Sequence, residues 1–137
     1  MPPLRFLETN VFLRHLMDDE PDHSPRSQAL FARIQRGELT VRTADTVIFE
    51  TVFTLQRFFR ISRSEIRDGL LPLLDLPGVI LPGKEHYQET FDLYVSHALL
   101  SFADCYHAVL MKQLGLEELF SFDRGFDRIP FVTRIEP

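Results

Sequence analysis

The chain has 137 residues, with 20 acidic against 15 basic side chains and a formal net charge of -5. Its apolar residues, 45% of the total with 13 Phe among them, suffice for a buried core, which excludes wholesale disorder. The length fits one compact domain over residues 1–137. The acidic excess argues against a protein that binds nucleic-acid backbones through bulk positive charge.

The single cysteine, Cys105, excludes an intramolecular disulfide and a cysteine-based zinc site. The N-terminal residues lack the apolar core of a signal peptide and the Arg-rich pattern of a transit peptide. No apolar run approaches membrane-spanning length. We therefore expect a cytoplasmic location and no membrane partner.

The first half of the chain alternates between strand and helix patterns. A short apolar strand at residues 4–7 ends near Glu8, and helical spacing follows over residues 11–16. After an acidic loop, Ser24 and Pro25 predict the start of a helix that ends before Gly37. Residues 39–41 then predict a second strand.

The alternation continues to the end of the sequence. Helices are predicted over residues 44–59 and after the capping box Ser62-x-x-Glu65, followed by a strand at 79–81. Further elements are a helix through 87–95, a helix over 102–114 capped by Ser101, and strands at 119–122 and 131–133. This order predicts an α/β fold, a three-layer α/β/α sandwich around a mainly parallel central sheet.

Four carboxylates occupy positions that call for an explanation. Glu8 and Asp123 each follow a short apolar strand, so a parallel sheet would place both at its ligand-binding edge. Glu50 lies in a strongly apolar helical segment, which predicts a partly desolvated carboxylate. Asp104 lies in a similar segment, although a capping box with Ser101 would also explain it.

Two interpretations of these acids remain open from the residues alone. A cluster of four carboxylates would repel itself without a cation, and oxygen ligands favour Mg²⁺ or Mn²⁺, which support metal-assisted hydrolysis of a phosphodiester. Alternatively, Glu50 and Asp104 pair with some of the 13 Arg side chains of the chain. Composition does not decide between them.

Four segments resemble the motifs of PIN-domain nucleases. Residues 6–14 (FLETNVFLR) resemble the family's Asp-Thr-Asn opening, and residues 47–52 (VIFETV) resemble the helix that carries its second acid. Residues 101–108 (SFADCYHA) resemble its Phe-x-Asp-x-x-x-Ala block, and residues 121–126 (SFDRGF) resemble its Thr-x-Asp-x-x-Phe block. The four segments occur in the family's order and span nearly the whole chain, which identifies a PIN-like domain over residues 1–137.

Size and architecture are most similar to the VapC toxins of toxin-antitoxin pairs. This resemblance implies an endoribonuclease that uses Mg²⁺ or Mn²⁺, forms a homodimer, cleaves RNA and is neutralised by a VapB-like antitoxin. It also implies the site residues. The catalytic and metal-binding acids would be Glu8, Glu50, Asp104 and Asp123; supporting polar groups would be Asn10, Ser121 and, further out, Asp127; Arg124 would meet the substrate.

The first acid departs from the family pattern, because Glu8 stands where the family usually has Asp. The extra methylene moves the carboxylate by about 1.5 Å, and Mg²⁺ requires strict octahedral geometry. An alternative function is therefore a catalytically impaired PIN-like module that binds RNA or protein. A receiver domain or a haloacid-dehalogenase-like phosphatase fits less well, because Glu8-Thr9-Asn10 lacks a second acid.

The densest basic run lies across the join of two predicted helices. It consists of Arg57, Arg60, Arg63 and Arg67, which fit contact with RNA phosphates, contact with an acidic partner, or a solvated face. The neighbouring aromatic residues are expected in core or dimer packing rather than as platforms for base stacking; they are Phe53, Phe58, Phe59 and Phe91.

Overall fold

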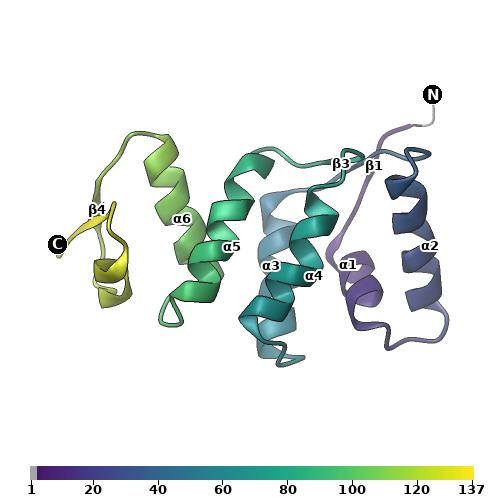
Figure 1. Cartoon of the computed structure of the whole chain (residues 1–137), viewed down its shortest axis with the longest axis horizontal. Coiled ribbons are helices and arrows are strands. Elements are labelled where there is room, and N and C mark those ends of the chain that lie inside the picture. The colour runs from purple at the N-terminus through teal and green to yellow at the C-terminus, as the bar shows by residue number, and fades with distance from the viewer. Residues whose placement is uncertain (1–2) are drawn as a thin grey trace. The chain divides into compact units, whose positions relative to one another are not determined.

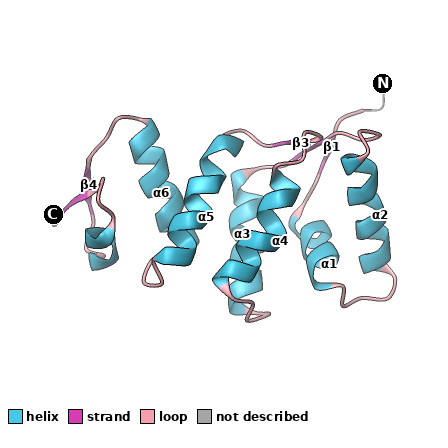
Figure 2. Ribbon diagram, in the orientation of Figure 1, coloured by secondary structure: helices cyan, strands magenta, loops and turns pink. Residues whose placement is uncertain are grey.

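A computed structural model describes residues 3–137 of the chain. These residues divide into two compact units, 3–84 and 85–137, and each unit is described by itself. Helices make up most of both units, and the strands are short (Figures 1 and 2).

The first unit contains three strands and four helices. They are β1 (Arg5–Phe6), α1 (Thr9–Met17), α2 (His23–Gln35), β2 (Val41–Arg42), α3 (Asp45–Arg57), α4 (Arg63–Leu74) and β3 (Val79–Ile80). The strands form a parallel sheet in the order β1-β2-β3, with Phe6 opposite Arg42 and Arg42 opposite Ile80. A helix pair separates each strand from the next, as parallel pairing requires.

The core of the first unit forms where α1 packs against α2 and α3. The Phe12 ring on α1 lies 5.5 Å from the Phe31 ring on α2, and both side chains are buried. On α3 and α4, Ile48 and Leu70 are fully buried. These contacts hold the start of α1, which follows β1 directly, in a fixed position.

The second unit is built on a pair of helices and a pair of strands. A 3-10 turn, η1 (Lys84–His86), precedes it, and its elements are α5 (Tyr87–Ser96), α6 (Phe102–Gln113), β4 (Glu118–Phe120), the 3-10 helix η2 (Arg124–Arg128) and β5 (Thr133–Ile135). Aromatic packing joins α5 to α6, with the Phe102 ring 4.8 Å from that of Phe91 and 5.3 Å from that of Tyr94. Strands β4 and β5 are parallel.

The predicted fold class, an α/β fold with parallel strands, is confirmed, since each of the three strand pairs described is parallel. Most elements lie within a few residues of their predicted ranges, and two of the differences have a structural reason. Helix α2 begins at His23, and the Ser24 hydroxyl, expected as a cap, is buried and accepts a hydrogen bond from the Glu20 N–H. Pro25 still lies in the first turn, where no intrahelical N–H bond is lost.

The last two strands lie at 118–120 and 133–135, although the sequence predicts 119–122 and 131–133. Phe122, expected in the first of them, is exposed in a loop. The observed β5 contains Arg134, a polar residue that apolar alternation does not select. Apolar character alone therefore misplaces this strand pair.

In the part of the chain that the structure describes, no helix has both the length and the apolar character needed to cross a membrane.

The turn before β3 generates a stability prediction. A Cβ at Gly78 would lie 2.9 Å from the Leu39 carbonyl oxygen and 2.9 Å from Ile34 Cγ2, and the backbone atom cannot move cheaply. We expect Gly78→Ala to lower the free energy of unfolding by about 1–3 kcal/mol. Chemical denaturation followed by circular dichroism measures this change.

Gly69→Ala is the matched control. Gly69 lies inside α4, where Ala gains about 0.5–1 kcal/mol over Gly, and its Cβ would meet only the flexible end of Leu16 at 3.2 Å. We expect this variant to be neutral or more stable. Equal destabilisation by both substitutions would contradict the packing described for Gly78.

Candidate active site

Glu8 lies at the junction of β1 and α1. Its backbone is extended, and it occupies the N-cap position of α1, where Oε1 accepts a hydrogen bond from the Asn10 N–H at 3.0 Å. Both side chains are exposed. Glu8 therefore lies at the carboxyl end of β1 and at the N-terminus of α1. A helix N-terminus stabilises a negative charge, so this position favours the ionised carboxylate.

The end of β1 is fixed by hydrogen bonds to the next strand. The Leu7 N–H donates to the Arg42 carbonyl at 2.7 Å, and the Thr43 hydroxyl donates to the Leu7 carbonyl at 2.9 Å. Thr43 is fully buried, and its own N–H donates to the Ile80 carbonyl on β3 at 2.9 Å. The residue that precedes Glu8 is therefore tied to the rest of the sheet.

Glu50 on α3 is exposed, so the expectation of a partly desolvated carboxylate is wrong. The buried face of α3 consists of Val47, Ile48, Thr51, Val52 and Leu55. Glu50 lies outside that face. Phe53, one of the apolar residues near Glu50 in the sequence, is itself exposed. Apolar residues on this helix are therefore not confined to its buried face, and they do not bury Glu50.

Asp104 lies in the first turn of α6. Its backbone N–H donates to the Ser101 Oγ at 3.1 Å, which confirms the predicted cap. The cap uses the Asp104 backbone, while the half-buried carboxylate projects from a helix N-terminus that favours a negative charge. The capping role and a ligand role therefore involve different atoms of this residue.

Ser121 and Asp123 form the turn that follows β4. The Ser121 Oγ accepts from the Asp123 N–H at 3.0 Å, and Asp123 Oδ1 accepts from the Gly125 N–H at 2.8 Å. A Cβ at Gly125 would lie 2.9 Å from Leu100 Cδ2, next to the residue that caps α6. The second unit thus places the Asp123 turn beside the start of the helix that carries Asp104.

Asp127 has a structural partner. Its two oxygens accept from Nε and Nη2 of Arg134 at 2.9 and 3.2 Å, and these hydrogen bonds hold the pKa of the Asp127 carboxyl below its usual value. Arg134 also donates to the Ser121 carbonyl at 3.1 Å and pairs with Glu136 at 3.0 Å. Asp127 therefore braces the Asp123 turn through Arg134. Arg124, the first residue of η2, is exposed.

The four principal acids share one electrostatic property. Within its own unit of the described residues, none of Glu8, Glu50, Asp104 and Asp123 forms an ion pair with a basic side chain. Arg side chains of the same unit therefore do not neutralise Glu50 or Asp104. The lack of a basic partner inside each unit fits these carboxylates as ligands of a hard cation.

The grouping of these acids stays a prediction. Glu8 and Glu50 belong to the first unit, and Asp104 and Asp123 to the second. Within either unit alone, the described Asp, Glu, His and Cys side chains include no group of three that could hold a metal ion.

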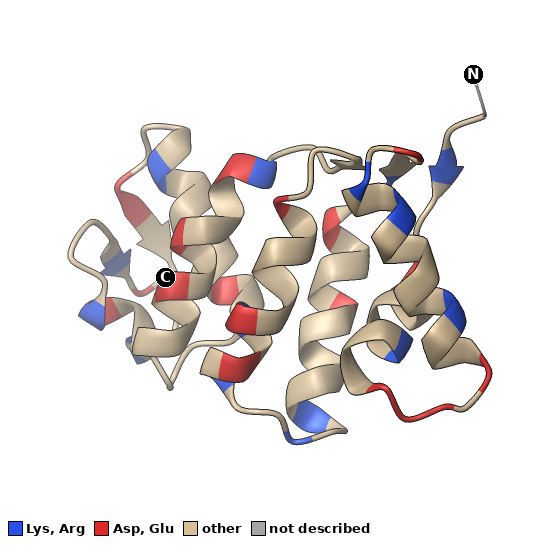
Figure 3. Ribbon diagram, turned by 45° about the vertical axis from the view of Figure 1, so that its right-hand side comes forward, with Lys and Arg blue, Asp and Glu red and all other residues tan. Residues whose placement is uncertain are grey.

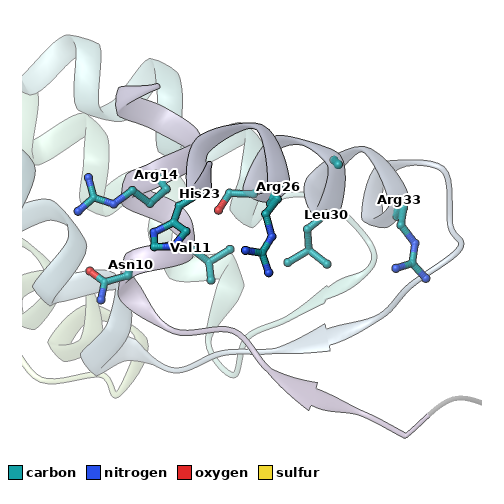
Figure 4. A pocket seen from close by; sticks show the side chains of 9 residues that line it. Asn10, Val11, Arg14, His23, Arg26, Leu30 and Arg33 are labelled. Atoms are coloured by element: carbon teal, nitrogen blue, oxygen red, sulfur yellow. The ribbon is translucent and has the colours of Figure 1, made fainter. Parts of the chain in front are cut away.

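A groove of about 860 Å³ lies between α1 and α2 (Figure 4). Asn10 marks one end and Arg33 the other, and sequence reasoning gave no sign of the groove because its two walls come from different helices. Three arginines line it, and each forms an exposed ion pair nearby: Arg14 with Asp19, Arg26 with Asp22, and Arg33 with Glu38.

Comparison with known proteins identifies the family. A model described as the PIN domain matches residues 5–132. The chain is 28% identical over 130 residues to a protein named VapC ribonuclease from Aquifex aeolicus (strain VF5), which covers 95% of both chains. It is also similar to the crystal structure of VapC20 of Mycobacterium tuberculosis, a Sarcin-Ricin loop cleaving toxin, with a TM-score of 0.41, 20% identity and coverage of 97% of this chain and 99% of that one.

The Thr43 hydroxyl generates a prediction about how Glu8 is positioned. Thr43→Val keeps the shape of the side chain but removes the buried hydrogen bond to the Leu7 carbonyl, so we expect the free energy of unfolding to fall by about 1 kcal/mol. Thr43→Ser, which keeps the hydroxyl, is the control. Denaturant unfolding measures both, and hydrogen exchange of the Leu7 amide should rise only in the Val variant. Equal exchange in the two variants would show that the hydroxyl does not hold the end of β1.

Proposed function

Because the chain belongs to the PIN-domain family, as its resemblance to that family predicted, we propose that it is a metal-dependent endoribonuclease of the VapC toxin type. The observation that carries the proposal is the family match over residues 5–132, together with four carboxylates that have no basic partner within their own unit of the described residues. The full-length similarity to a VapC ribonuclease supports RNA as the substrate.

The proposed metal ligands are Glu8, Glu50, Asp104 and Asp123. Their donor chemistry fits Mg²⁺ or Mn²⁺, because all are carboxylate oxygens and Cys105, the single thiol, is buried. A bound divalent ion would supply an ionised water and charge stabilisation at the phosphodiester.

The chain's own hydrogen bonds prepare these ligands. In Glu8 and in Asp123, one carboxylate oxygen accepts a backbone N–H, which restricts the side chain and leaves the second oxygen for a ligand. Ser121 fixes the Asp123 backbone, and Arg134 fixes the Ser121 carbonyl. Asn10 is exposed beside Glu8 and can orient a water, and exposed Arg124 can bind a substrate phosphate.

An impaired RNA- or protein-binding module is the less favoured alternative. It rests on Glu8 alone, and the similarity to a ribonuclease over 95% of the chain favours a competent enzyme. Glu8 keeps the charge of the usual Asp, and its capped conformation folds the longer side chain back onto α1.

The remaining parts of the proposal rest on the family resemblance. We propose that residues 1–137 act as a single domain, that the protein forms a homodimer in the cytoplasm, and that a VapB-like antitoxin inhibits it.

Asp104→Asn tests the nuclease directly. It removes one proposed ligand charge but keeps the backbone N–H that Ser101 caps, so the fold should persist. We expect RNA cleavage with Mg²⁺ or Mn²⁺ to fall by at least about 100-fold, and calorimetry should show weaker Mn²⁺ binding. Asp68→Asn, an exposed acid paired with Arg67, is the control and should keep wild-type cleavage. Undiminished cleavage by Asp104→Asn would overturn the proposed site.

Glu8→Asp separates the two functional alternatives. If the native site is competent, the shorter side chain should change the cleavage rate less than about 10-fold, because the ligand charge is kept. A rise from a baseline near zero to clear activity would instead support the impaired module. Parallel measurement of Mn²⁺ affinity shows whether any change in rate follows from metal binding.

A further inference from the structure

The exposed face of α3 is a continuous stripe that includes Glu50. Thr46, Glu50, Phe53 and Arg57 recur at spacings of three or four residues, and all four are exposed. Glu50 and Arg57 are two helical turns apart, about 10.5 Å along the axis. The Phe53 side chain between them is 65% exposed.

Beyond Arg57 the chain turns into α4 through a well-fixed loop, which we call the α3–α4 tip (residues 57–62). The Phe58 and Phe59 N–H groups donate to the Thr54 carbonyl at 2.9 and 3.1 Å, and the Ile61 N–H donates to the Leu55 carbonyl at 3.0 Å. Arg60 has a φ of 57°, a left-handed conformation that costs free energy in a non-glycine residue. The tip therefore has a defined backbone conformation, and its Arg57, Phe58 and Arg60 side chains are exposed.

Phe58 projects from this tip, although the sequence suggested core or dimer packing for it. Its side chain is 79% exposed, and its ring makes an edge-to-face contact with Phe59, at 5.4 Å between ring centroids. A Phe that stays in water forgoes the stabilisation that burial would give. Its flat face is available for stacking.

The charge around Phe58 is basic. Basic positions gather at the end of α3 and in the loop that follows (Figure 3). In the described part of the chain, neither Arg57 nor Arg60 forms an ion pair, in contrast to the paired arginines of the α1–α2 groove. Both guanidinium groups are exposed, so they are available to phosphates.

We propose that Phe53, Arg57, Phe58 and Arg60 form a surface that binds single-stranded RNA next to Glu50. This inference rests on the proposed function, which makes Glu50 a ligand at the scissile phosphate. Bases stack on the two aromatic rings and phosphates pair with the two arginines, as in other single-strand binders.

The chemistry favours RNA over a second copy of the chain. A two-fold contact through this surface would bring the uncompensated guanidinium groups on both sides of Phe58 against the same basic surface of the second copy, where like charges repel. It also favours single strands, because a duplex hides the faces of its bases.

The test is equilibrium binding of a fluorescein-labelled 12-nucleotide single-stranded RNA in EDTA, with the RNA shown to be intact on a gel. We expect Phe58→Ala to raise Kd about 5- to 150-fold. Arg57→Gln combined with Arg60→Gln should lower the slope of log K against log salt by about 1.4. Leu114→Ala, an exposed apolar residue of α6's C-terminal end, and Arg36→Gln, a paired arginine, are the controls and should bind like wild type.

If the Phe58 and Arg57/Arg60 variants bind this RNA as tightly as the controls do, the proposal that this surface binds RNA is wrong. Equal affinity for duplex RNA would contradict the proposed base stacking. If Phe58→Ala converts a dimer to a monomer, as measured by size-exclusion chromatography with light scattering, the surface is a chain-chain interface instead.

Cleavage is assayed separately with Mn²⁺. Binding that depends on the tip without any cleavage would support this surface and overturn the proposed nuclease; cleavage without such binding would do the reverse.

Discussion

Backbone N–H groups at the starts of helical segments hold the local structure around three of the four candidate carboxylates. Glu8 and Asp123 each accept one such N–H, and the N–H of Asp104 itself is satisfied by Ser101. Unpaired donors at a helix start favour a nearby negative charge. A carboxylate at such a position is therefore stabilised without a basic partner. The strand or helix that carries the residue determines where its negative charge lies.

Interactions between residues close together in the sequence are the ones that the sequence predicts. Caps are local, so Ser62 and Ser101 were recognised from the spacing of a few residues. Glu8 was placed correctly after β1 because a strand that runs directly into a helix leaves a clear change of period. The identity of the four acids depended on the order of the motifs along the chain.

Features that depend on side chains from distant segments could not be obtained in this way. The apolar neighbours of Glu50 suggested burial, but the actual exposure depends on which face of α3 the other helices cover. Similarly, β5 is stabilised by pairing with β4 and by the contacts of Arg134, which no local pattern reveals. For the same reason, apolar character alone does not decide between core and dimer packing for Phe58: its exposure excludes core packing within the first unit, and dimer packing stays a prediction.

Arg134 has a consequence for the order in which the second unit acquires its structure. Its guanidinium holds Asp127 and the Ser121 carbonyl, and the Ser121 N–H donates to the Ile135 carbonyl on the same strand at 3.1 Å. During synthesis, residues 133–135 leave the ribosome after the turn that carries Asp123, so that turn cannot acquire its final support until they emerge. The Asp123 turn therefore becomes complete only after β5 has paired with β4.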